Sequence, residues 1–229
     1  MQTLTPKVTL FNITENPLAN IALGIDAWHA EKIPTSKDHW TREQLEEKFR
    51  WLLLQPHQTP LEYVSMVWVL ENCSRAFQTQ LVRHRIGFSY SIQSMRVVEC
   101  GKFADNRAYH MPRSVKDKVD YHKSMLAIQA MYRDALNHGE SQEDARGLLP
   151  LNVQSPITFA CSYRALIGLL KQRLCVAAQE EWTYVAEQMR EELERVEPLL
   201  VLPLDCMCKR FANGKGFCKT LHKNVTGEL

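Results

Sequence analysis

The sequence QLVRHRI over residues 80–86 runs directly into GFSYSIQSMR over residues 87–96. Three cations follow an apolar turn, and a run of hydroxyl and amide side chains then leads to one more arginine. Such a set presents many hydrogen-bond donors, and guanidinium groups pair well with phosphate oxygens. We therefore expect this stretch to hold a phosphorylated ligand, with the rest of the chain arranged around it.

The length and charge of the chain predict one main domain that binds neither nucleic acid nor membrane. The 229 residues can bury a substantial core. A formal net charge of +2 is too small for a protein that coats a phosphate backbone. No apolar run is long enough to cross a bilayer, and the N-terminus lacks the pattern of a secretory signal. We expect a cytoplasmic protein whose main domain covers residues 1–204, followed by a cysteine-rich basic tail over residues 205–229.

Apolar periodicity and capping residues predict a mixed α/β chain dominated by helices. Thr41 and Gln44 form a capping box, which sets the start of a helix with an apolar face. The predicted helices are 41–53, 74–83, 114–138, 141–150, 164–174 and 177–196. The predicted strands are 63–70, 95–98 and 157–163, the first of them buried on both faces. Residues 87–93 are expected to form a loop, and residues 1–39 are unassigned apart from a structured segment at 21–28. The apolar stripe of the last helix is Trp182, Val185, Met189, Leu193 and Val196.

Arginines next to apolar residues are the strongest chemical signal, and they are Arg83, Arg85, Arg96, Arg146, Arg164 and Arg173. Each one alone is more often a structural ion pair or a side chain that reaches out to solvent. Together they favour an anionic ligand, because a guanidinium in an apolar setting needs a carboxylate or phosphate partner.

No competing catalytic signature is present in the sequence. It has no glycine-rich nucleotide loop, no nucleophile elbow and no His-Glu-x-x-His motif. None of the cysteines follows a proline, so the sequence lacks a Pro-Cys nucleophile. If the ligand is a pyrimidine nucleotide, a bound cofactor must therefore carry the covalent or redox chemistry.

Arg83-His84-Arg85, followed by Ser94 and Arg96, resembles the signature of the flavin-dependent thymidylate synthases, which is Arg-His-Arg, seven residues and then Ser. Residues 57–62, HQTPLE, are similar to the family's His-Glu-Thr-Pro-Phe-Glu, and residues 145–152, ARGLLPLN, to its Ala-Arg-x-x-Leu-Pro-Leu-Asn. The resemblance extends in order and at compatible spacing from about Thr41 to Leu200.

The resemblance implies a small central, mostly antiparallel sheet surrounded by helices, in the α/β (α+β) class. It also implies an enzyme that binds FAD and transfers a one-carbon unit from methylenetetrahydrofolate to C5 of dUMP, with NADPH as reductant. The family assembles as a homotetramer whose active sites are shared between subunits.

By position in the motifs, the implied FAD contacts are Thr59, Glu62, Arg83, His84, Arg85, Ile86, Ser162, Tyr163 and Arg164. The implied nucleotide contacts are Gln80, Arg83, Gln93, Ser94, Arg96, Arg146 and Arg173. Arg173 is expected to face the uracil edge as the catalytic residue, because a permanent positive charge stabilises the negative charge that spreads over the ring oxygens when C5 becomes nucleophilic.

Several positions depart from the family pattern. The signature is one residue longer, with Gln93 where the serine would be counted, and Ile92 replaces the usual acidic residue. Beyond Arg173, Cys175 and Ala177 replace the usual Asp and His. These departures leave two alternatives open: the same chemistry on another pyrimidine nucleotide or with a 5-hydroxymethyl product, or a non-catalytic relative that only binds nucleotide.

The tail carries a separate candidate site. Seven cysteines, an odd number, argue for reduced thiols rather than a disulfide framework. Zinc would accept three thiolates and one imidazole in tetrahedral geometry, and the tail offers Cys206, Cys208, Cys218 and His222. The alternative is a basic tail with free thiols.

Overall fold

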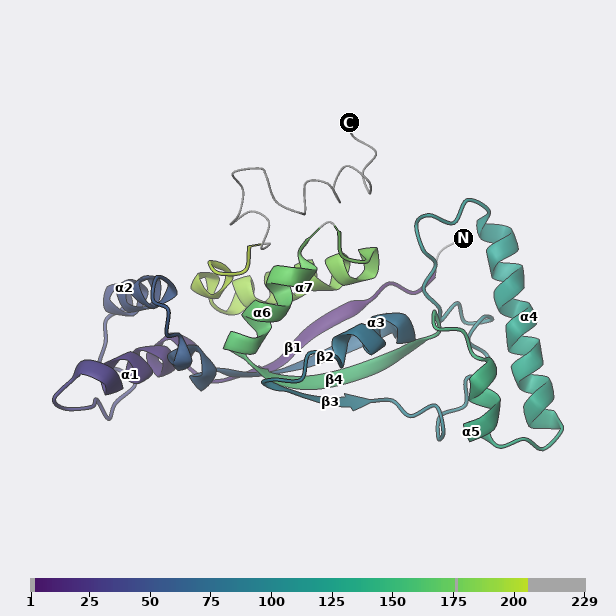
Figure 1. The fold of residues 1–229 in the computed structure, drawn as a ribbon, viewed down its shortest axis with the longest axis horizontal. Helices are drawn as coiled ribbons and strands as arrows, with labels where there is room; N and C mark the ends of the chain where they lie inside the picture. Colours follow the sequence, from purple (N-terminus) through teal and green to yellow (C-terminus); the bar gives the residue numbers. More distant parts are fainter. Residues whose placement is uncertain (1–2, 176, 206–229) are drawn as a thin grey trace. The chain divides into compact units, whose positions relative to one another are not determined.

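A four-stranded sheet forms the centre of the fold in this computed structural model, which describes residues 3–175 and 177–205. Its strands are β1 (Lys7–Ile13), β2 (Ser65–Ser74), β3 (Phe88–Ile92) and β4 (Gln154–Ser162). They pair in the order β1-β2-β4-β3 (Figure 1). Backbone bonds at the strand ends, such as Tyr163 N to Val64 O at 2.8 Å and Gln93 N to Pro156 O at 3.3 Å, show that neighbouring strands are antiparallel. The expected sheet is therefore confirmed.

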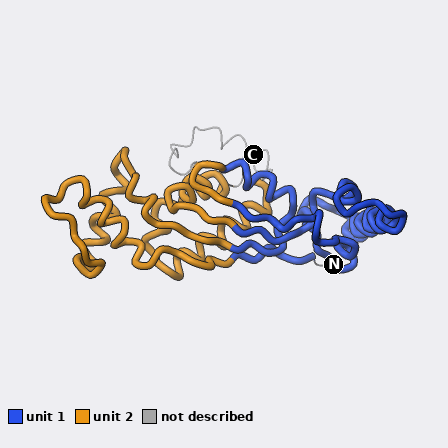
Figure 2. Tube along the Cα trace, turned by 90° about the horizontal axis from the view of Figure 1, so that it is seen from below, with its two compact units in different colours: residues 1–8, 69–84, 90–158 blue, residues 9–68, 85–89, 159–229 orange. Residues whose placement is uncertain are grey.

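The helices account for most of the remaining structure. They are α1 (Pro17–His29), α2 (Arg42–Leu53), α3 (Arg75–Leu81), α4 (Lys118–Asn137), α5 (Gln142–Ala145), α6 (Tyr163–Arg173) and α7 (Glu180–Val196). Short 3₁₀ helices cover Thr59–Tyr63, Arg146–Leu148 and Pro198–Val201. The chain forms two compact units, and each contains segments from distant parts of the sequence (Figure 2). Of the described residues, unit 1 takes 3–8, 69–84 and 90–158, and unit 2 takes 9–68, 85–89, 159–175 and 177–205.

Unit 2 has a core of aromatic side chains that come from its strands. Trp68 of β2 stacks on Phe159 of β4 with ring centroids 6.5 Å apart, and Phe88 lies 6.0 Å from Phe159. Tyr163, the first residue of α6, is fully buried, and its hydroxyl donates to the Leu200 carbonyl at 2.5 Å. The hydroxyl bond ties the start of α6 to the 3₁₀ helix at Pro198–Val201.

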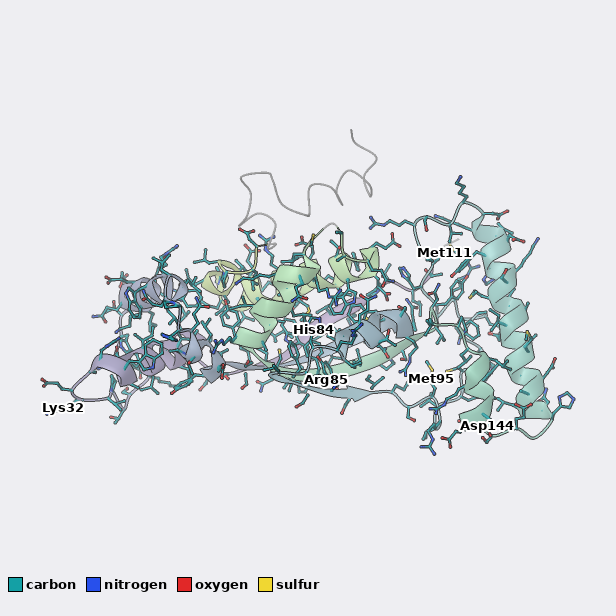
Figure 3. The ribbon with its side chains drawn as sticks, in the orientation of Figure 1. Lys32, His84, Arg85, Met95, Met111 and Asp144 are labelled. Carbon is teal, nitrogen blue, oxygen red and sulfur yellow. The ribbon has the colours of Figure 1, made fainter. Side chains whose placement is uncertain are left out.

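Unit 1 has a core of its own, which lies between α4 and the loops after β3. It contains the buried residues Met95, Phe103, Ala104, Tyr109, Met125 and Val153, and Figure 3 labels Met95 in it. On α4, the buried amide of Gln129 accepts from Ala104 N at 2.7 Å and donates to Asp105 at 2.8 Å. The loop that follows β3 is therefore tied to α4 by both packing and hydrogen bonds.

The predicted strand at residues 95–98 is wrong, and a strand forms earlier, at residues 88–92, where a loop was expected. The reason is local: the Ser94 carbonyl accepts from Val97 N at 3.2 Å and from Val98 N at 3.0 Å, so these groups close a turn. Both valines are exposed. The apolar residues of this segment therefore lie in a turn instead of a strand. Of residues 95–98, only Met95 is buried.

Other predicted boundaries of helices and strands also differ from those in the structure. The predicted strand 63–70 begins later, because residues 59–63 form a 3₁₀ helix, and it extends to Ser74. The unassigned N-terminus contains β1 as well as α1. In α7 the predicted stripe is buried except for Val196, which is 50% exposed where the helix ends. The capping box of Thr41 and Gln44 is present as expected.

Burial of Cys161 on β4 gives a prediction for alkaline stability. Burial raises the pKa of this thiol from 9.0 to about 12, so the native state keeps the proton at pH values where the unfolded state loses it. The free energy of unfolding should therefore fall between about pH 9 and pH 12, by about 1.4 kcal/mol per pH unit from this group. In urea unfolding experiments over this pH range, the free energy of unfolding of Cys161→Ala should fall less steeply with pH than that of wild type. Equal slopes in the two proteins would contradict the prediction.

Candidate functional site

The Arg-His-Arg stretch follows directly from α3, whose position is set by two polar residues. Ser74 ends β2 and also caps α3, since its hydroxyl accepts from Phe77 N at 3.0 Å. The buried amide of Gln78 donates to the Ser155 carbonyl at 2.8 Å, which attaches the helix to β4. Gln80 lies in the last turn of α3, and Arg83 follows as an exposed side chain. The Tyr90 hydroxyl donates to the His84 carbonyl at 2.5 Å, which fixes the chain just after the end of α3.

The boundary between the two units falls inside this stretch, after His84 and before Arg85, both of which Figure 3 labels. Within unit 2, Gly87 allows a close approach to α6. Its φ is +75°, and an added Cβ would lie 2.8 Å from the Ala165 Cβ. Its carbonyl accepts from Ser162 N at 3.1 Å. A glycine is therefore required here. The preceding Ile86 is 93% exposed.

Two of the arginines expected on the nucleotide meet in unit 1 on one carboxylate. Arg96 Nη2 lies 2.7 Å from Glu143 Oε2, and Arg146 Nη2 lies 3.8 Å from Glu143 Oε1. Ser94 lies at the start of the same turn, where its hydroxyl accepts from Arg96 N at 3.3 Å. A cavity of about 380 Å³ opens here, lined by Ser94, Arg96, Val97, Ser141, Gln142 and Glu143.

Arg75 lies near Arg146, although it was not among the arginines selected from the sequence. Burial lowers the pKa of its guanidinium, and the positive charge of Arg146 lowers it further. Its Nη1 donates to the Gln78 amide oxygen at 3.0 Å. Arg75 stands at the first position of α3, far in sequence from Arg146, so only the fold reveals that the two cations are neighbours.

Most of the residues expected on the flavin lie in unit 2, whereas Arg83 and His84 lie in unit 1. Glu62 and Arg164 form an ion pair at 2.7 Å, each with about half of its side chain exposed. Ser162 caps α6, since its hydroxyl accepts from Ala165 N at 3.3 Å. The side chain of Tyr163 is committed to the core, where burial raises its pKa well above 10, so only its backbone remains for a ligand.

A recess of about 500 Å³ adjoins Thr59 in the same unit, and the sequence did not predict it. It is lined by Trp28, His29, Trp51, Gln55, Pro56, His57 and Thr59. The His29 ring meets both indoles edge to face, with centroids 6.2 Å apart in each case. The indoles are about 40% exposed, which is uncommon for rings of this size.

Arg173 ends α6 within unit 2. Its guanidinium carbon lies 4.6 Å from the centroid of the Trp182 ring, and Trp182 is fully buried at the start of α7. Burial lowers the pKa of Arg173, yet an arginine stays charged in proteins. The ring face therefore orients a permanent cation.

Gln93 follows β3 as a half-buried residue, and its N–H donates to the Pro156 carbonyl, as above. Among the described residues no group of three or more His, Cys, Asp or Glu side chains could hold a metal ion. The predicted zinc ligands Cys206, Cys208, Cys218 and His222 lie outside the described residues. In the described part of the chain no helix is long and apolar enough to cross a membrane.

Comparison with known sequences gives a consistent result. A family model described as thymidylate synthase complementing protein matches residues 9–199. The flavin-dependent thymidylate synthase of Pyrococcus furiosus is 32% identical over 195 residues, covering 82% of this chain and 79% of that protein. The enzyme of the same name from Nitratidesulfovibrio vulgaris is 30% identical over 230 residues, covering 93% of this chain and 91% of the relative.

Solved structures share the fold at lower identity. The flavin-dependent thymidylate synthase of Helicobacter pylori, complexed with FAD and dUMP, matches with a TM-score of 0.72 at 18% identity, covering 87% of this chain and 99% of that one. A UMP/dUMP methylase of Streptomyces cacaoi, bound with 5-Br dUMP, matches with a TM-score of 0.70 at 22% identity, covering 88% and 95%.

Proposed function

This chain belongs to the thymidylate synthase complementing protein family, and we propose that it is an FAD-dependent enzyme that methylates C5 of dUMP to give dTMP. Methylenetetrahydrofolate would supply the carbon and NADPH the reducing equivalents. The observation that carries the proposal is the cluster in unit 1, where Arg96 and Arg146 converge on Glu143 and an open cavity is lined by Ser94 and Arg96. Guanidinium groups with a hydroxyl suit the phosphate of a nucleotide monophosphate.

Gln80, Arg83 and Gln93 would complete the contacts to the nucleotide. Gln80 and Arg83 are brought to one end of α3 by the caps and hydrogen bonds described above. Arg173 would face the uracil, where its charge would stabilise the negative charge that builds on the ring oxygens. Its place over the Trp182 ring supports this role, because a guanidinium held in one orientation needs little reorganisation during the reaction.

The residues in unit 2 fit a flavin dinucleotide. The exposed Arg85 and the first turn of α6, which is capped by Ser162 and carries Arg164, offer donors of the kind that bind pyrophosphate. Thr59, Glu62, Ile86 and the Tyr163 backbone would add further contacts from this unit. Arg83 and His84, which belong to unit 1, are the remaining proposed contacts. Bound FAD would supply the hydride for reduction of the transferred carbon.

Two alternatives differ in substrate or product. Ile92 stands where the family has an acidic residue, so the groups that face the base differ from the family pattern. A protein of the same fold is named a UMP/dUMP methylase, which supports another pyrimidine nucleotide as substrate. A 5-hydroxymethyl product is the other alternative with the same cofactors.

Mass spectrometry of the nucleotide product decides between these substrates and products. Purified protein would be incubated with methylenetetrahydrofolate, NADPH and either dUMP, UMP or dCMP. Formation of dTMP from dUMP supports the proposal, whereas a product only from another nucleotide, or a hydroxymethyl product, would replace it. A protein that stays colourless after addition of FAD would indicate a relative that binds nucleotide without catalysis.

We also propose a cytoplasmic homotetramer. Large apolar side chains stay exposed next to the ligand-binding motifs, namely Ile86, Leu148 and Leu151, which supports burial of these positions against other subunits. The thiols of Cys100 and Cys161 support a reducing compartment. Analytical ultracentrifugation should give four times the chain mass, and a monomer would contradict the proposal.

A further inference from the structure

Glu143 is the carboxylate that holds the two phosphate-binding arginines of the proposed site. It faces Arg96 through Oε2 at 2.7 Å and Arg146 through Oε1 at 3.8 Å. The Glu143 carbonyl also accepts from Arg146 Nε at 3.0 Å. One residue, through its carboxylate and its backbone carbonyl, thus faces the donors that a phosphate would need.

The charges around Glu143 are unbalanced. The guanidinium groups of Arg96 and Arg146 face this single carboxylate, and a third guanidinium, that of Arg75, lies near Arg146. Burial lowers the pKa of Arg75, and the charge of Arg146 lowers it further, so the two cations repel each other. A phosphate dianion would compensate the cations better than one carboxylate does.

The frame around the cavity can stay in place while the carboxylate moves. The Gln142 amide faces the carbonyls of Arg96 and Val97, and turning the amide so that its nitrogen points to them lets it donate to both, at 3.1 Å and 3.2 Å. Ser141 caps the short helix α5 by accepting from Asp144 N at 3.2 Å. The Glu143 side chain is 47% exposed and that of Arg96 57%, so water can solvate both groups when they separate.

We propose that Glu143 is an internal competitor for the nucleotide phosphate: its carboxylate pairs with Arg96 and Arg146 in the ligand-free protein and is displaced when phosphate binds. The inference rests on the proposed function for the identity of the nucleotide. The carboxylate keeps the cationic cluster compensated before substrate arrives, and it lowers the affinity of the site for phosphate.

Neutralising Glu143 should strengthen binding. An exposed carboxylate–arginine pair is worth little, so Glu143→Gln should lower the Kd for dUMP by roughly two- to fivefold. The FAD-loaded, full-length protein would be titrated calorimetrically with dUMP, deoxyuridine and inorganic phosphate. Deoxyuridine lacks the phosphate, so its affinity should not change, whereas inorganic phosphate should bind more tightly to the variant.

Asp144→Asn is the matched control. Asp144 is the next residue on α5 (Figure 3), and its carboxylate bonds Ser141 at 2.7 Å instead of the arginines. This variant should bind dUMP and phosphate as wild type does. Circular dichroism and the thermal midpoint would show that both variants fold.

The outcomes separate this inference from the proposed function. If Glu143→Gln binds phosphate and dUMP no more tightly than wild type, or if Asp144→Asn gives the same gain, the competitor role is overturned. The role is also overturned if no form of the protein binds phosphate. If Glu143→Gln gains affinity for inorganic phosphate while no pyrimidine nucleotide binds, the competitor role stands and the proposed function fails.

Discussion

Replacing Arg173 with glutamine is expected to lower kcat for dTMP formation by about 10²- to 10³-fold, because one charged stabiliser of the developing anion is lost. The Kd for FAD should stay within about twofold, since the proposed flavin contacts lie elsewhere in the chain. Steady-state kinetics with dUMP, methylenetetrahydrofolate and NADPH would measure kcat, and flavin absorbance would report FAD binding.

Arg190→Gln provides the control for this experiment. Arg190 lies on α7 and forms an ordinary exposed ion pair with Glu187 at 3.6 Å. It should keep wild-type kcat. If Arg173→Gln keeps activity within a few-fold of wild type, or loses activity together with FAD binding, the catalytic role of Arg173 is wrong.

Truncating Phe159 to alanine should destabilise the protein by about 3–5 kcal/mol. Its ring is 2% exposed and lies between Trp68 and Phe88, so its removal leaves a cavity in the aromatic core of unit 2. Urea unfolding followed by circular dichroism would give the free energy of unfolding for the variant and for wild type.

Phe11→Ala is the matched control in the same sheet. Phe11 lies on β1 with 72% of its surface exposed, so its truncation should change stability by no more than about 0.5 kcal/mol. Similar losses in the two variants would show that the aromatic stack contributes nothing beyond an exposed phenylalanine.

Local signals in the sequence predicted most helices well. Thr41, Ser74 and Ser141 all cap helices, as expected, because a side-chain oxygen next to free N–H groups acts over only a few residues. The stripe of α7 was likewise visible as a 3.6-residue period. The arginines that bear the family resemblance could be selected in the same way, from position in the motifs.

Edge strands were harder to predict. Only Val8 of β1 is buried, so this strand lacks an apolar pattern along its length. In β3 the alternation Phe-Ser-Tyr-Ser-Ile does have a period of two, but its serines suggested a loop. Both strands form because a neighbouring strand pairs with their backbone, and that pairing depends on residues far away in the sequence.

The charge relations at the candidate site also depend on the fold. Arg75 and Arg146 become neighbours only after β2 and β4 pair and α3 attaches through Gln78. Glu143 looked like one of many surface carboxylates in the sequence, and only the distances to Arg96 and Arg146 single it out.

The strand-to-helix corners have a consequence for how the chain can vary in length. Ser74 ends β2 and caps α3, and Ser162 ends β4 and caps α6, so no spare residue lies between strand and helix. One residue inserted there would turn the helix by about 100° against its strand and point its arginines elsewhere. Insertions and deletions should therefore be excluded at both corners, and β3 with its following turn is where the chain can absorb the extra residue of its signature.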